Sequence, residues 1–157
     1  MIYEIHLYAP KTGRLTPSML RWLIEHGADP AQPEAFWPVR RIKPYALARL
    51  LLKLDRTLIP EQGARGDVLL HYPMRDLGLS LHVHERGVII RFPLVGSLLA
   101  RIVLGICYTY IHFLYDQGGF WSYDPQINVL SYADDYQSIE ETAALMNELL
   151  PKLLTRD

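Results

Sequence analysis

A stretch of about 22 residues, Leu94 to Tyr115, contains a single charged residue, Arg101. This length is sufficient to cross a bilayer. Arg101 opposes insertion, because a charge near the centre of a membrane helix costs about 2.5–3.5 kcal/mol. The stretch also carries polar groups on Tyr108, Thr109 and His112, and no basic cluster flanks it. We therefore expect no membrane span, but a helix buried on most sides against a sheet and a second helix or another subunit.

The composition is that of one folded domain spanning residues 1–157. Half of the 157 residues are hydrophobic, and the 16 basic and 17 acidic side chains nearly cancel. This balance excludes a disordered chain and a globally cationic nucleic-acid binder. The single cysteine, Cys107, excludes a disulfide framework and the multi-cysteine zinc patterns. The first residues, Met1 to His6, lack the basic and apolar regions of a secretory signal, so we expect a cytoplasmic protein.

Hydrophobic periodicity predicts the elements of the first half of the chain. Ile2–Tyr8 alternates like a strand. Thr16 is expected to cap a helix that begins at Pro17, and Gly27 suits a left-handed residue at its end. A second helix is expected over Pro44–Leu58, with one apolar and one basic face. The apolar face consists of Leu47, Leu50, Leu51, Leu54 and Leu58, and the basic face of Arg49, Lys53 and Arg56.

Three strands are expected next, over Asp67–Tyr72, Leu79–His84 and Val88–Phe92. A tight turn at Arg86-Gly87 between the last two would place His84 opposite Ile89 and His82 opposite Arg91. A three-residue loop that ends at Gly87 is the alternative. The tight turn is preferred because it keeps the apolar residues of both strands on one face. Six core side chains are predicted to be fully buried: Leu81, Val83, Leu98, Ile102, Val103 and Ile106.

The last third should contain a long helix, a short strand or hairpin, and a final helix. The apolar helix is expected over Ser97–Asp116, and the strand or hairpin surrounds a turn at Asp124-Pro125. Ser138 and Glu141 form a capping box that begins the final helix, and Pro151 ends or kinks it. The order β-α-α-β-β-β-α-β-α predicts an α+β domain, with an antiparallel sheet of four to five strands and helices mainly on one face.

Two histidines on one predicted strand offer a possible metal site. His82 and His84 are two residues apart, so both imidazoles emerge on the same face. A third ligand from His71, Glu85 or Asp67 would complete a site for a small hydrolase or a metal-dependent enzyme. The alternative is a solvated strand face, which needs polar residues in any case. No HExxH motif, nucleophile-elbow motif or phosphate-binding loop occurs, so we expect neither a cofactor nor an identifiable catalytic residue.

Charge is strongly segregated along the chain. Seven basic and only two acidic residues lie between Arg40 and Arg65, whereas seven acidic residues and no basic one lie between Asp116 and Glu148. Tyrosine and tryptophan interleave with the acidic segment, as is typical of protein interfaces. The alternative is that the two segments neutralise each other within the fold. The predicted recognition residues are Trp121, Tyr123, Asp124, Asp134, Asp135 and Tyr136.

The segment Tyr123-Asp124-Pro125-Gln126 resembles part of a group of small bacterial α+β proteins. These proteins open with a strand like Ile2–Tyr8, and in them a long helix precedes a YDPQ turn and strand. The likeness covers the first strand and about the C-terminal third. Some members look like immunity proteins encoded beside secreted toxins. The resemblance implies a binding role rather than an enzymatic one, with a toxin as the partner that the protein neutralises.

The partner expected from these observations is a protein. An acidic, aromatic surface would steer a basic toxin, such as a nuclease, towards the binding site. We expect neither a nucleic acid nor a membrane as partner. A homodimer that buries the Leu94–Tyr115 helix is a further alternative, because that helix has too little polar surface to face water on all sides.

Overall fold

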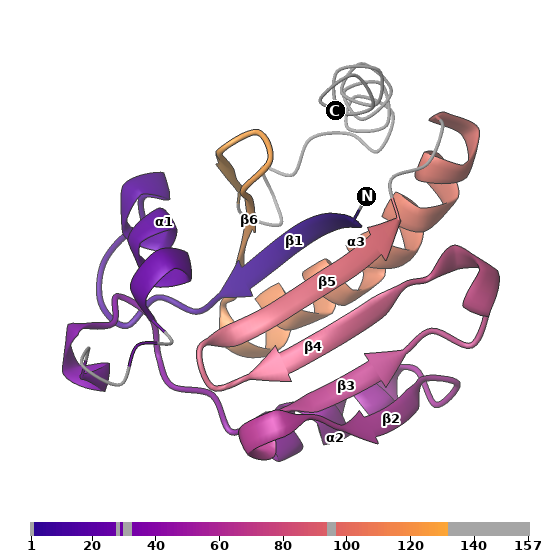
Figure 1. Ribbon diagram of the computed structural model, residues 1–157, viewed down its shortest axis with the longest axis horizontal. Helices are drawn as coiled ribbons and strands as arrows, with labels where there is room; N and C mark the ends of the chain where they lie inside the picture. The colour runs from indigo at the N-terminus through magenta and orange to yellow at the C-terminus, as the bar shows by residue number, and fades with distance from the viewer. Residues whose placement is uncertain (1, 28, 30–32, 94–96, 132–157) are drawn as a thin grey trace.

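The computed structural model describes residues 2–27, 29, 33–93 and 97–131. Helices pack on an antiparallel sheet, so the predicted α+β class is confirmed (Figure 1). Short 3-10 turns lie at Glu34–Phe36, Ala64–Gly66 and Arg75–Leu77. The other elements, in chain order, are β1 (Ile2–Tyr8), α1 (Pro17–His26), α2 (Pro44–Leu54), β2 (Ile59–Gln62), β3 (Val68–His71), β4 (Ser80–His84), β5 (Gly87–Pro93), α3 (Ser97–Gly118), β6 (Trp121–Asp124) and β7 (Val129–Ser131).

The sheet has seven strands in the order β2-β3-β4-β5-β1-β6-β7, so the expected number of four to five is wrong. Strand β2 was not predicted, because Pro60 cannot donate a backbone hydrogen bond. Proline is nevertheless tolerated on an edge strand, and β2 is the edge strand beside β3. At the other edge, β6 and β7 form the hairpin around Asp124-Pro125. The final helix predicted from Ser138 lies outside the described residues.

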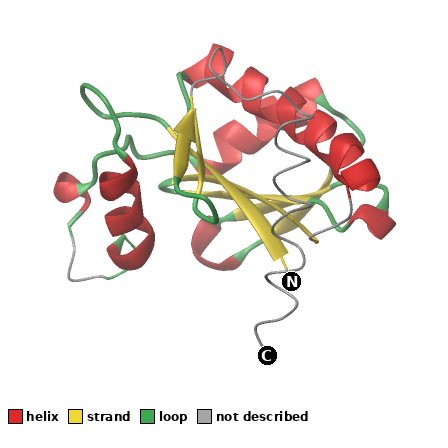
Figure 2. Cartoon of the chain, turned by 90° about the horizontal axis from the view of Figure 1, so that it is seen from above, coloured by secondary structure: helices red, strands yellow, loops and turns green. Residues whose placement is uncertain are grey.

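Helices α2 and α3 cover one face of the sheet and form the main core with it. The long helix α3 runs along one side of the sheet in Figure 2. The strands contribute Tyr3, Ile5, Leu7, Val68, Leu70, Leu81, Val83, Val88, Ile90 and Phe92 to this core. Helix α1 packs elsewhere, in a second cluster with Tyr8 and Tyr123. Tyr8 points away from Leu7 by strand alternation, so α1 lies at one end of the opposite face. We call that opposite side the polar face.

Helix α3 buries one stripe rather than most of its surface. The stripe consists of Ala100, Val103, Leu104, Cys107, Tyr110, Ile111 and Leu114, which is the spacing of one helix face. Of the predicted core residues, Leu81, Val83 and Val103 are buried as expected. Ile102 is 54% exposed and Ile106 is only partly buried, because both lie off this stripe. The side chain of Leu98 lies outside the described set.

Across the described part of the chain, no helix is both long and apolar enough to span a membrane. Helix α3 comes nearest to the length required, with 22 residues. Exposed Arg101 and Thr109 and the ion pair between His112 and Asp116 lie along it.

The β4–β5 hairpin turns one residue earlier than expected, which shifts the strand register by two residues. The turn is at Glu85-Arg86, and His84 pairs with Gly87 instead of Ile89. A shift of two residues keeps every side chain on its predicted face, so the buried positions remain correct. Gly87 is the first residue of β5. The close packing there requires glycine, because a Cβ atom would be 2.2 Å from the carbonyl oxygen of Leu7.

The end of α1 also differs from the prediction. Gly27 has a φ of −62° rather than a left-handed conformation. A Cβ atom on Gly27 would lie 2.8 Å from Cδ of Arg86 and 2.9 Å from Cδ1 of Leu23. Close packing therefore explains this glycine. At the start of the helix, Thr16 accepts a hydrogen bond from the backbone of Met19, as its role as N-cap requires.

Candidate functional site

A chain of charged hydrogen bonds crosses the polar face. Arg91 on β5 donates through Nε to Glu4 on β1 (2.9 Å) and through Nη1 to Nδ1 of His82 on β4 (3.1 Å). His82 in turn donates through Nε2 to Asp67 (2.8 Å). Glu4 also accepts from Nε2 of His6, at 2.9 Å. Both ring nitrogens of His82 are therefore engaged, and neither is free to bind a metal in this arrangement.

His84 and His71 occupy different surroundings from His82. Nδ1 of His84 accepts the backbone N–H of Arg86 (3.2 Å), which places the proton on Nε2. Nε2 of His84 is buried and has no hydrogen-bond partner among the described residues. His71 pairs with Glu61 on β2, at 2.6 Å. Within the described residues, no three ligand-type side chains gather around a common point, so His71, His82 and His84 do not form the metal site considered as an alternative.

The burial of His84 makes the stability of the fold depend on pH. Burial, and then the positive charge of Arg86, lower the pKa of His84 to about 3. The same residue in an unfolded chain has a pKa of about 6.5. As the pH falls below 6.5, the unfolded state takes up a proton that the native state excludes, so stability is lost between pH 6.5 and about 3. Burial also lowers the pKa of His6, which adds to this trend.

We expect the exclusion of a proton from buried His84 to lower the free energy of unfolding by about 2 kcal/mol when the pH falls from 7.5 to 5. His84→Leu should remove this part of the pH dependence, whatever its effect at pH 7.5. Urea unfolding of the parent and the variant at both pH values measures the difference. His112→Leu is the control, because it removes an exposed histidine of α3 and should retain the part of the pH dependence that His84 causes. An equal pH dependence in the parent and His84→Leu would contradict the prediction.

The predicted recognition residues that the structure describes are largely packed inside the fold. Tyr123 is only 2% exposed and donates to Oδ1 of Asn128 at 2.6 Å. Asp124 accepts hydrogen bonds from Tyr3 and, within the turn, from the backbone of Gln126. Trp121 is partly buried against the second cluster. These residues were expected to be presented near a turn, but β6 lies between β1 and β7, so its side chains are used for packing. Asp134, Asp135 and Tyr136 lie outside the described residues.

Within the described residues, the cations of the basic segment form no ion pair with Asp116 or Asp124, the two acids of the acidic segment that the structure describes. Arg40 donates to the carbonyl oxygen of Gly118 at the end of α3. Arg41 forms ion pairs with Glu34 (3.0 Å) and Glu85 (2.9 Å). The other five cations of the segment are exposed and make no ion pair with any described residue: Lys43, Arg49, Lys53, Arg56 and Arg65.

Arg49 and Lys53 lie on α2, and Lys43 and Arg56 lie just before and just after it, near exposed apolar side chains. Of the predicted leucine face, Leu47 and Leu51 are buried, whereas Leu50 and Leu54 are 38% and 40% exposed. We define the α2 surface as Tyr45, Arg49, Leu50, Lys53, Leu54 and Arg56, all of which are exposed.

A groove of about 270 Å³ adjoins the α2 surface, between α2 and the end of α3. Ala46, Leu47 and Leu50 of α2 and Phe120 supply most of its apolar lining. Its other lining residues include the cations Arg40, Arg41 and Lys43. The groove can therefore accept an apolar side chain close to several positive charges.

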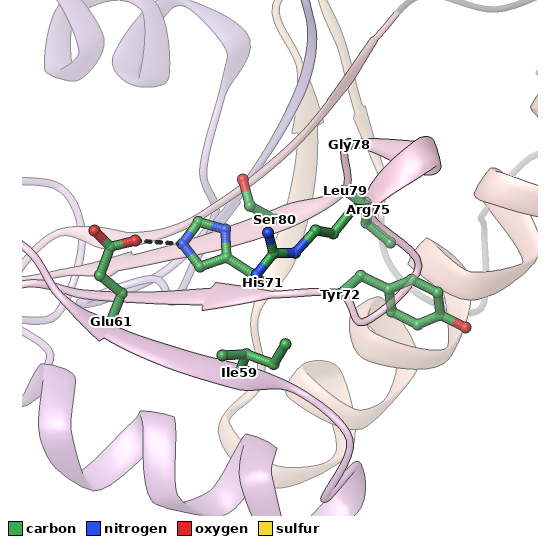
Figure 3. Close-up of a pocket in the computed structure, with 8 residues that line it drawn as sticks. All are labelled: Ile59, Glu61, His71, Tyr72, Arg75, Gly78, Leu79 and Ser80. Carbon is green, nitrogen blue, oxygen red and sulfur yellow. Dashed lines mark hydrogen bonds and ion pairs between the residues drawn. The ribbon is translucent and has the colours of Figure 1, made fainter.

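A larger cleft of about 590 Å³ lies over β2, β3 and β4 (Figure 3). His71 and Ser80 are direct cross-strand neighbours in this cleft. The next pair along, Tyr72 and Leu79, is hydrogen-bonded, because the backbone N–H of Tyr72 donates to the carbonyl oxygen of Leu79 (2.9 Å). His71 and Ser80 are therefore a non-hydrogen-bonded pair, in which the side chains are closest. Arg75 extends its guanidinium group towards both from the 3-10 turn Arg75–Leu77.

Sequence analysis found only one residue of this cleft, His71. Glu61 was missed because it lies on the unpredicted strand β2. Arg75 was missed because a three-residue turn has no periodicity.

Comparison of the chain with family models, with curated proteins and with solved structures finds no match. The geometry of the chain's own surfaces therefore has to support any assignment of function.

Proposed function

We propose that this protein is a non-enzymatic binding protein whose α2 surface contacts an acidic region of a partner protein. The supporting observation is that the exposed side of α2 alternates apolar groups with cations that no described residue neutralises. Tyrosine and arginine are the residue types most often found at the energetic centres of protein interfaces. An exposed helix face with both contact area and unpaired charge is therefore suited to recognition.

The apolar component favours a protein over a nucleic acid as the partner. Nucleic-acid binding sites are dominated by phosphate contacts, which need cations but not exposed leucines. Leu50 and Leu54 would remain in water on a phosphate backbone, whereas a protein could cover both and insert a side chain into the adjoining groove. The resemblance to immunity proteins makes a toxin the specific partner in this proposal. The toxin surface that meets α2 would be acidic. This differs from the expectation from sequence, in which a basic toxin surface meets Asp134 and Asp135.

Reversing two charges with Arg49→Glu/Lys53→Glu is expected to slow association about tenfold and to flatten its salt dependence, because charges at the rim of an interface act mainly on encounter. The partner is captured from a lysate of the source cell with the full chain as bait and is then purified. Surface binding kinetics at low and physiological salt then compare parent and variant. Circular dichroism verifies that both are folded.

Arg21→Glu/Arg101→Glu is the matched control. It makes the same change in net charge at exposed positions of α1 and α3. Screening limits the effect of such distant charges at physiological salt, so this variant should bind like the parent. The proposal is wrong if both double variants lose the partner equally, if neither differs from the parent, or if the parent retains no protein.

A further inference from the structure

The cleft over β2, β3 and β4 contains hydrogen-bond donors that have no acceptor among the described residues. Neither Ser80 nor Arg75 makes a hydrogen bond or ion pair with a described residue, although both line the cleft. Figure 3 shows the Arg75 guanidinium, the Ser80 side chain and the His71 ring converging on one region. Two free donors beside an imidazole favour a ligand that supplies acceptor oxygens.

The unpaired guanidinium group in the cleft favours a negatively charged group on the ligand. Glu61 lies against His71 at 2.6 Å, so its carboxylate already has a hydrogen-bonding partner. Arg75 is then the one lining cation without a partner among the described residues. Its planar guanidinium group presents two parallel N–H groups, which match the two oxygens of a carboxylate.

The walls of the cleft favour an apolar body on that ligand. Ile59 and Tyr72 supply apolar groups to its lining (Figure 3). A volume of about 590 Å³ is within the range of small-molecule sites. We propose that this cleft binds a small organic carboxylate, with Arg75 and Ser80 holding the carboxylate and with Ile59 and Tyr72 contacting its apolar part. This site is separate from the α2 surface.

The geometry of the cleft fits a binding site better than the active site of a hydrolase. A serine nucleophile needs a hydrogen bond to its general base, and no such bond joins Ser80 to His71 in the described structure. The hydrolase predicted as an alternative was also to use His82 and His84. His82 is engaged by Arg91 and Asp67, and neither histidine lines this cleft.

The test titrates hexanoate, and hexanamide as its neutral counterpart, into the isotopically labelled full chain, with backbone NMR shifts as the readout. Hexanoate should bind at least about tenfold more tightly than hexanamide, because the amide cannot form the charge-assisted pair with Arg75. The largest shifts are expected at His71, Arg75 and Ser80. Arg75→Gln should bring the affinity for hexanoate down to that for hexanamide.

Two control variants separate the possible outcomes. Arg65→Gln removes an exposed arginine at the other end of the β2–β3 hairpin, outside the cleft lining, and it should bind hexanoate like the parent. Arg49→Glu/Lys53→Glu should do the same, so a failure of the α2 proposal would leave this one standing. Equal affinity for the two ligands, shifts confined to another region, or unchanged binding by Arg75→Gln would each overturn the proposal.

Discussion

Replacing Leu81 with alanine is expected to lower the unfolding free energy by about 2–5 kcal/mol. Leu81 lies on the central strand pair β4–β5 and is fully buried under the helices of the main core. The truncation removes apolar contacts and leaves a cavity that a rigid sheet cannot fill. Urea unfolding monitored by circular dichroism at pH 7 measures the loss.

Ile102→Ala provides the contrast within the same structure. Ile102 was predicted to be a core residue, but it is 54% exposed on α3. Its truncation should change the unfolding free energy by no more than about 0.5 kcal/mol. If Leu81→Ala and Ile102→Ala cost the same, the assignment of the inward faces of the hairpin and of α3 would be wrong.

Gly87→Ala is the second substitution with a large expected effect, a loss of about 3 kcal/mol or more. The added Cβ atom would lie 2.2 Å from the backbone oxygen of Leu7 and 2.8 Å from the ring of Tyr8. A backbone atom in a paired strand cannot move away without disturbing the β1–β5 ladder. The same unfolding measurement tests this prediction.

Gly105→Ala is the matched control, and its expected sign is opposite. A Cβ atom on Gly105 would meet no heavy atom within 4 Å. Alanine is favoured over glycine inside a helix by about 0.8–1.0 kcal/mol, so this variant should be more stable than the parent. A loss of stability in Gly105→Ala, or a neutral Gly87→Ala, would contradict the packing described for β1, β5 and α3.

Local patterns were sufficient for most elements. Alternation predicted β1 over its observed range, and Thr16 and Pro44 marked where α1 and α2 begin. The hairpin face was also correct, because a register error of two residues leaves side-chain orientation unchanged. The long helix was predicted almost to its ends. Each of these inferences depends on residues close together in the chain.

The candidate sites were harder to predict. His82 and His84 share a strand, but their ring nitrogens face different groups contributed by Asp67, Arg86 and Arg91. Tyr123 belongs to an aromatic, acidic segment, yet β6 pairs with β1 and buries it. The charge segregation was evident, but only the structure shows which cations of the basic segment have no ion pair with a described residue.

The sequence by itself determined the class of the fold, the kind and approximate bounds of its main elements, and the inward face of the central hairpin. The tertiary structure decided which stripe of α3 faces the sheet, whether β2 joins the sheet despite Pro60, and why Gly87 is a glycine. It also decided that Arg75, His71 and Ser80 share one cleft. Periodicity reports the local backbone state, whereas these outcomes depend on contacts between distant segments, which no local pattern encodes.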